Sequence, residues 1–82
     1  MNGLQCKLAR VALGWGVRQL AETANVSTQT ISRLERGEQL RAGTLGGIMQ
    51  VFEAAGIEFL WGDGDDFGIM IKKLHSLTSA DD

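Results

Sequence analysis

The chain has 82 residues, of which 44 % are apolar and 22 % charged, and this composition is typical of one small soluble globular domain. No apolar run is long enough to span a membrane, and Lys7 and Arg10 interrupt the apolar positions that a signal peptide would need. The only cysteine, Cys6, excludes an intrachain disulfide, so we expect a reducing, cytoplasmic location.

The net charge of −2 conceals an uneven distribution of charge along the chain. Residues 1–41 contain six lysines or arginines and three acids, whereas residues 42–82 contain two lysines and seven acids. The basic half favours contacts with phosphates, and the acidic half would limit indiscriminate binding to them.

Apolar residues at helical spacing predict two helices in the first part of the chain. Residues 3–13 form the first, with its apolar positions at Leu4, Leu8 and Val11. Two glycines interrupt the pattern, and residues 17–24 then form a short second helix that ends at Asn25, a residue that tolerates a left-handed turn.

A third helix is predicted over residues 28–36, after a tight turn. Ser27 is a suitable N-cap, and Gly37 ends the helix. Only Ile31 and Leu34 form an apolar stripe, so the rest of the helix surface is polar. This polar face is either a plain solvated surface or a surface that recognises a ligand.

A fourth helix and two strands are predicted in the second half. Thr44 caps the helix and Gly56 ends it. Residues 57–61 have apolar side chains at every second position, which predicts a strand, and residues 62–66 form a turn. Residues 67–73 form a second strand, and the alternative is a short amphipathic helix over 67–77. We expect a mainly α fold of four helices and a C-terminal β-hairpin, with a disordered tail over 76–82.

Two short helices joined by a tight turn, with a capped second helix, form a helix-turn-helix unit. The second helix of such a unit enters the DNA major groove and presents its N-terminal turns to base edges. In this segment, "LAETANVSTQTISRLERGE", the pairs Leu20-Ala21, Val26-Ser27 and Ile31-Ser32, followed by Glu35 and Gly37, resemble the Xre family of lambda-repressor/Cro-like regulators. The resemblance covers roughly residues 7–60, and it implies a DNA-binding domain over residues 1–56.

The resemblance also assigns roles to individual residues. The positions that contact bases in the family are Thr28, Gln29, Ser32 and Arg33 here, and the expected phosphate contacts are Arg18, Ser27, Thr30, Arg36 and Arg41. Arg10 and Glu35 hold positions that form a structural ion pair in several members. The chain departs from the family at Gly16 and Val17, where a Ser or Thr followed by Gln usually caps the second helix and contacts a phosphate.

The segment 57–75 is predicted to form a homodimer, because an isolated apolar hairpin is marginal in water and its open edge favours pairing with another chain. The residues expected at this interface are Ile57, Phe59, Trp61, Phe67, Ile69 and Ile71. A dimer would place two recognition helices about 34 Å apart, which matches an inverted-repeat operator.

The resulting hypothesis is a sequence-specific regulator of transcription, a repressor that binds double-stranded DNA. The alternatives are the DNA-binding antitoxin of a toxin–antitoxin pair, with the toxin as a protein partner, and a protein-interaction module that no longer binds DNA. An enzyme is not expected because the sequence contains no nucleophile–base pair or phosphate loop, and neither a metal site nor a cofactor is predicted.

Overall fold

The structure, a computed structural model, describes residues 1–72 as four helices followed by a two-stranded antiparallel sheet. The predicted tail 76–82 and the last residues of the predicted segment 57–75 lie outside the described part. The elements are α1 (Gly3–Ala12), α2 (Val17–Ala24), α3 (Thr28–Glu35), α4 (Ala42–Ala54), β1 (Ile57–Trp61) and β2 (Phe67–Ile71). This confirms the prediction of a mainly α fold with a C-terminal hairpin.

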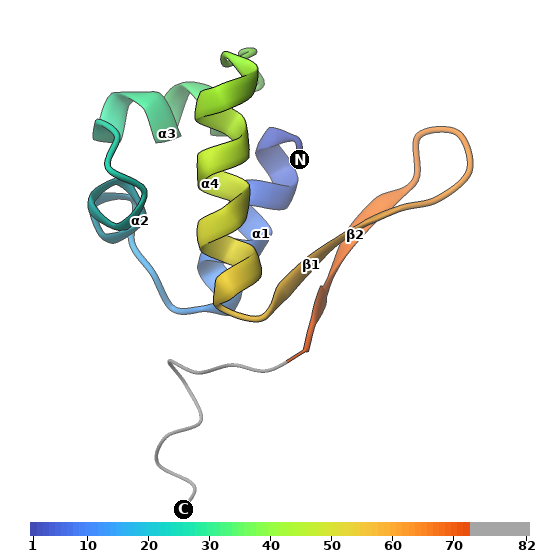
Figure 1. The fold of residues 1–82 in the computed structure, drawn as a ribbon. Helices are drawn as coiled ribbons and strands as arrows, with labels where there is room; N and C mark the ends of the chain where they lie inside the picture. The colour runs from blue at the N-terminus through green and yellow to red at the C-terminus, as the bar shows by residue number, and fades with distance from the viewer. Residues whose placement is uncertain (73–82) are drawn as a thin grey trace, which may run out of the picture.

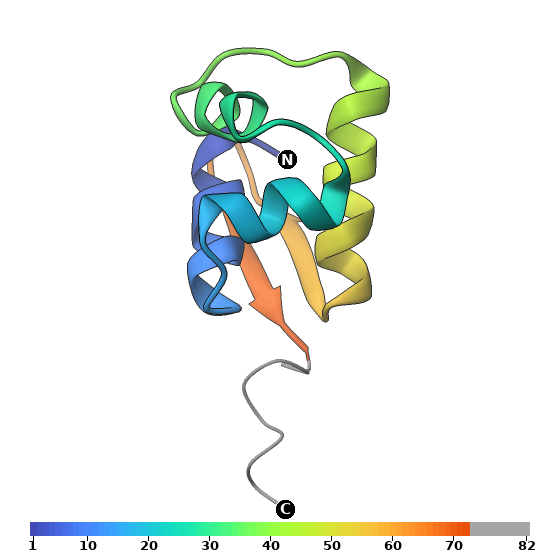
Figure 2. The same cartoon turned by 90° about the vertical axis from the view of Figure 1, so that its left-hand side faces the viewer.

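The helices surround a small core, and the hairpin covers one side of it. Figure 1 shows α2 and α3 on one side of α4 and the hairpin on the other. In Figure 2 the strands lie behind, between α1 and α4, while α2 crosses in front and α3 lies at the top. The helix-turn-helix unit and the hairpin therefore occupy different faces of the molecule.

Phe52 is at the centre of the core and links α4 to its neighbours. Its ring stacks on Trp15 from the α1–α2 turn, at a centroid distance of 5.9 Å, and meets the edge of Phe59 from β1, also at 5.9 Å. Leu20 of α2 and Ile31 of α3 are fully buried in the same cluster. One apolar cluster thus joins α2 and α3 to the hairpin.

The buried face of α1 differs from the stripe that predicts this helix. Leu4, Leu8 and Val11 are exposed at 53 %, 42 % and 62 % of their surface. The side chains of Cys6 and Ala9 enter the core instead, together with that of Gln5. Helix α1 therefore has two apolar stripes, and the one with smaller side chains is buried.

Helix α4 begins earlier than the sequence indicates. Arg41 is its N-cap residue, the helix starts at Ala42, and no side chain caps it. The prediction that Thr44 caps this helix is therefore wrong, because the chain becomes helical two residues before the threonine. The end is as expected: Gly56 follows the helix with φ +100°, in the left-handed region that glycine adopts without strain.

The hairpin is held to α1 by a buried glutamine. The Nε2 group of Gln5 donates to the backbone oxygens of Leu60 (3.1 Å) and Gly68 (2.9 Å), which are paired residues on β1 and β2. Its Oε1 accepts from the backbone N–H of Asn2 at 3.0 Å, which completes a capping box at the start of α1. One fully buried side chain thus fixes both the helix start and the hairpin position.

The second strand is shorter than the predicted range 67–73, since β2 ends at Ile71. Residues 67–71 pair with β1 in an antiparallel register, with Phe59 opposite Ile69 and Trp61 opposite Phe67. The alternative of a helix is therefore wrong for residues 67–71, and the part of it beyond residue 72 lies outside the described residues.

Candidate nucleic-acid interface

The turn between α2 and α3 is built from three consecutive residues. Asn25 has φ +59° and ψ +46°, and the N–H of Val26 donates to the backbone oxygen of Ala21 at 2.9 Å, which ends α2. Ser27 is then the N-cap of α3, and its Oγ accepts from the backbone N–H of Thr30 at 3.1 Å. These local contacts set the angle between the two helices of the unit.

Helix α3 turns its polar side outward. Ile31 and Leu34 are buried, while Gln29 and Arg33 each lie two residues from Ile31, about 200° around the helix. Both of these side chains are exposed, as is that of Thr28, and Ser32 is half-buried. Within residues 1–72, none of these four side chains forms a hydrogen bond or an ion pair with protein.

The cations expected at phosphates are all on the surface. Arg18, in the first turn of α2, and Arg41, the N-cap residue of α4, are exposed and form no ion pair with any of residues 1–72. Arg36 forms an exposed pair with Glu38 at 3.3 Å. The hydroxyls of Ser27 and Thr30 lie 2.9 Å apart and form a hydrogen bond with each other.

The start of α2 reflects the departure from the family pattern. Gly16 is the N-cap residue and forms no side-chain hydrogen bond, and Val17 is half-buried against the core. The first backbone N–H groups of α2 therefore lack a side-chain cap.

Arg10 and Glu35 form a two-armed ion pair that links α1 to the end of α3. Arg10 Nε and Nη2 donate to the two carboxylate oxygens of Glu35, each at 2.9 Å. Their side chains are only 14 % and 12 % exposed. The hydrogen bond to Glu35 raises the pKa of Arg10, and Arg10 Nη1 also donates to the backbone oxygen of Trp15 at 3.2 Å. The pair thus connects α1, the α1–α2 turn and the end of α3.

Cys6 is the third member of this cluster. Its Sγ donates to Glu35 Oε2 at 3.4 Å. Burial, followed by the neighbouring negative charge of Glu35, raises the pKa of the Cys6 thiol to about 12. The cysteine is consequently a neutral core group and not a reactive thiol.

Helix α1 and helix α3 approach each other most closely at Gly3. A Cβ atom at this position would overlap the carbonyl oxygen of Leu34. Only a residue without a side chain allows the start of α1 to pack directly against the end of α3. Together with the Arg10–Glu35 pair, this contact fixes the position of α3 on the domain.

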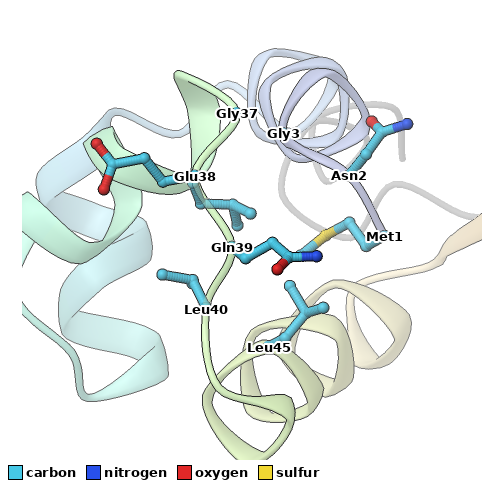
Figure 3. A pocket seen from close by; sticks show the side chains of 9 residues that line it. Met1, Asn2, Gly3, Gly37, Glu38, Gln39, Leu40 and Leu45 are labelled. Carbon is cyan, nitrogen blue, oxygen red and sulfur yellow. The ribbon is translucent and has the colours of Figure 1, made fainter.

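A shallow cavity of about 270 Å³ lies behind the end of α3. It is lined by Met1, Asn2, Gly3, Leu34, Gly37, Glu38, Gln39, Leu40 and Leu45. Figure 3 shows the side chains of Gln39, Met1 and Leu45 converging, whereas the carboxylate of Glu38 points away. The converging side chains are uncharged.

The residues expected at a dimer interface divide into two groups. Ile57 is buried in the core of its own chain, and Phe59 and Ile69 pack against that core. Trp61, Phe67 and Ile71 remain exposed, at 60 %, 39 % and 46 %.

Sequence reasoning missed Gln5 and Gly3. The only signal for Gln5 is its position three residues after Asn2, as in a capping box, and nothing in the sequence indicates its contacts with the hairpin.

Residues 1–72 contain neither a cluster of metal-ligating residues nor a helix that could span a membrane. Among residues 1–72 there is no group of three or more His, Cys, Asp or Glu that could hold a metal ion. Likewise, no helix in this range is long and apolar enough to cross a bilayer.

Comparison with known proteins identifies the fold family. A family model described as "Helix-turn-helix" matches residues 7–57, which include α2, the turn, α3 and the whole of α4. No curated protein matches the chain significantly. The match confirms the predicted resemblance and spans more than half of the 82 residues. The chain therefore belongs to the Xre, lambda-repressor-like family of helix-turn-helix proteins, which are DNA-binding regulators and generally not enzymes.

Proposed function

We propose that this protein is a transcriptional repressor that binds an inverted-repeat operator as a homodimer. The observation that carries the proposal is the outward face of α3, where Gln29 and Arg33 are exposed and have no partner within residues 1–72. An α-helix with its side chains is about 10–12 Å in diameter, which matches the width of the B-DNA major groove, and the eight residues of α3 form about two turns.

The chemistry of these side chains matches that of base edges. A glutamine amide can pair with N6 and N7 of adenine, and an arginine guanidinium with O6 and N7 of guanine, each worth about 1–3 kcal/mol of discrimination. Gln29 and Arg33 are four residues apart, so they lie on one side of α3, one turn from each other. Thr28 and Ser32 have the same spacing and complete the proposed base-reading face.

The surrounding cations would hold the helix in the groove. Arg18 and Arg41 are exposed and unpaired within residues 1–72, and we assign them to phosphates because they lie outside α3. Arg36 would join them by exchanging Glu38 for a phosphate, since their exposed ion pair is weak. Phosphate contacts of this kind fix the position of a protein on DNA without reading its sequence.

The experiment is selection from randomised duplex DNA with the full chain, followed by sequencing of the bound pool. We expect an enriched inverted repeat for the wild type. Arg33→Lys keeps the charge but loses the two-pronged contact, so it should relax one position in each half-site. Arg41→Ala is the matched control. It should weaken binding to all sequences without changing the preferred sequence. The slope of the logarithm of the binding constant against the logarithm of the salt concentration should fall by the amount expected for about one phosphate contact.

Three other outcomes would contradict the proposal. A bound pool without any enriched sequence would exclude a sequence reader and favour the protein-interaction module. An enriched sequence that Arg33→Lys leaves unchanged would show that α3 does not use Arg33 to read bases. If instead the chain co-purifies with a toxin and selects DNA only in that complex, it is an antitoxin and not an independent repressor.

A further inference from the structure

We propose that the second subunit of the dimer packs its hairpin across helix α1, an element that the strand-pairing hypothesis does not include. This inference rests on the homodimer in the proposed function and specifies its interface. We call the region the α1–hairpin surface; it consists of Leu4, Leu8, Val11, Trp61, Phe67 and Ile71.

The large exposed apolar side chains of the described residues 1–72 are concentrated on two elements. Within residues 1–72, all seven large hydrophobic side chains that are exposed lie on α1 or on the hairpin. Helices α2, α3 and α4 have none. Met70 lies on the other face of the hairpin, because neighbouring residues of a strand alternate. Soluble monomers usually show large exposed hydrophobic side chains singly, so the remaining six on two packed elements mark an interaction surface.

The two elements form one continuous surface because they pack against each other. Gln5 of α1 donates a hydrogen bond to the backbone oxygen of Gly68 in β2. Leu8 follows Gln5 by three residues, so it lies one turn further along the neighbouring face of the helix. The stripe of Leu4, Leu8 and Val11 therefore borders the hairpin on the outside of the molecule.

The distribution of charge identifies a second copy of this chain as the partner. Helix α1 has an exposed lysine, Lys7, and no acidic residue, whereas the hairpin turn over residues 62–66 has three aspartates and no base. A surface with a basic part and an acidic part is complementary to itself when a twofold rotation exchanges the two parts. The acidic turn of each hairpin would then lie against Lys7 of the other copy.

The same arrangement leaves the DNA-binding face free. Figure 1 shows the hairpin on the side of the molecule away from α2 and α3. Two copies joined through the α1–hairpin surface would therefore both present α3 to DNA. The exposed rings of Trp61 and Phe67, which are in contact at a centroid distance of 6.4 Å, would supply aromatic anchors of the kind that dominate interfaces.

The experiment measures the dimer dissociation constant of the full chain by sedimentation equilibrium. Val11→Lys places a charge on the α1–hairpin surface, at a site that is 62 % exposed and therefore tolerant in the folded subunit. We expect it to raise the dissociation constant at least about tenfold. Gln50→Lys adds the same charge to an exposed site on α4, and it should change the constant by no more than about twofold.

Two further measurements test the same interface independently. Lys7→Glu should also weaken the dimer, and adding Asp65→Lys should restore part of the affinity, because the reversed charges attract again. Dimer formation should shift the tryptophan emission of the wild type to shorter wavelength as Trp61 leaves water. Val11→Lys should show this shift only at higher protein concentration.

The results that would overturn this interface differ from those that would show that the protein does not recognise DNA. If Val11→Lys and Lys7→Glu both dimerise like the wild type, the second copy does not use α1. If the wild type stays monomeric at micromolar concentration, both this inference and the homodimer are wrong. A stable dimer that enriches no DNA sequence would instead contradict the proposed function and leave the interface intact.

Discussion

Gln5 gives the sharpest test of how the hairpin is attached to the helical domain. We consider Gln5→Met, which keeps the length and approximate volume of the side chain but removes its amide. The variant loses two hydrogen bonds donated to strand carbonyls and one accepted from Asn2, all between 2.9 and 3.1 Å. Each such bond contributes about 0.5–1.5 kcal/mol net, which gives a gross loss of about 1.5–4.5 kcal/mol.

Part of this loss is offset, because the thioether of methionine is less costly to bury than an amide. We therefore expect Gln5→Met to lower the free energy of unfolding by about 1–3 kcal/mol. Urea unfolding, followed by circular dichroism at one fixed protein concentration, measures this difference. Gln50→Met is the matched control because Gln50 is exposed on α4, and it should stay within about 0.5 kcal/mol of the wild type.

Hydrogen exchange locates the effect in the molecule. Amides of β1 and β2 should exchange faster in Gln5→Met, whereas those of α2 and α3 should keep most of their protection, since their core contacts are unchanged. A stability equal to that of Gln50→Met, or faster exchange spread evenly over all elements, would refute the idea that Gln5 is the attachment point of the hairpin.

Three further predictions concern the support of α3. Glu35→Met should lower the free energy of unfolding by about 3–5 kcal/mol, because it leaves Arg10 mostly buried and unpaired. Adding Arg10→Met should recover a large part of this free energy, as measured by urea unfolding. If the losses of the two single variants simply add in the double variant, Arg10 and Glu35 are not coupled. Gly3→Ala should lower the melting temperature and weaken DNA binding, because its Cβ displaces the end of α3 at Leu34; unchanged binding would show that the two helices can separate freely. The thiol of Cys6 has a pKa of about 12 in the folded chain, against 9.0 in the unfolded chain. The stability that the thiol contributes is therefore complete below pH 9.0 and is lost between pH 9.0 and about 12. A Cys6→Ala variant should lack this component of the alkaline unfolding curve.

Local features of the sequence predicted most of the secondary structure. The turn of the helix-turn-helix unit is specified within a few residues: Asn25 tolerates the left-handed conformation, and Ser27 caps the helix that follows. The strands follow in the same way from alternating apolar residues. The start of α4 was predicted incorrectly because no capping side chain marks it, and Arg41 begins the helix with backbone geometry alone.

The proposed base-reading face also follows from the sequence. Once Ile31 and Leu34 define the buried side of α3, the helical period places Gln29 and Arg33 outside. The family resemblance then supplies the expectation that this outer face reads DNA, and the family match confirms the resemblance.

The tertiary structure decided which of two apolar stripes on α1 is buried. Leu4, Leu8 and Val11 have larger side chains than Cys6 and Ala9, so sequence hydrophobicity favours the wrong face. The smaller residues are buried because α1 passes close to α3 and to the hairpin, where only small side chains and the hydrogen-bonding Gln5 fit. A helical period depends on one helix alone, whereas burial depends on the elements packed around it. The sequence by itself therefore determined the helices and the buried face of α3, where only one apolar stripe exists, and only the tertiary structure decided which of the two stripes of α1 is buried.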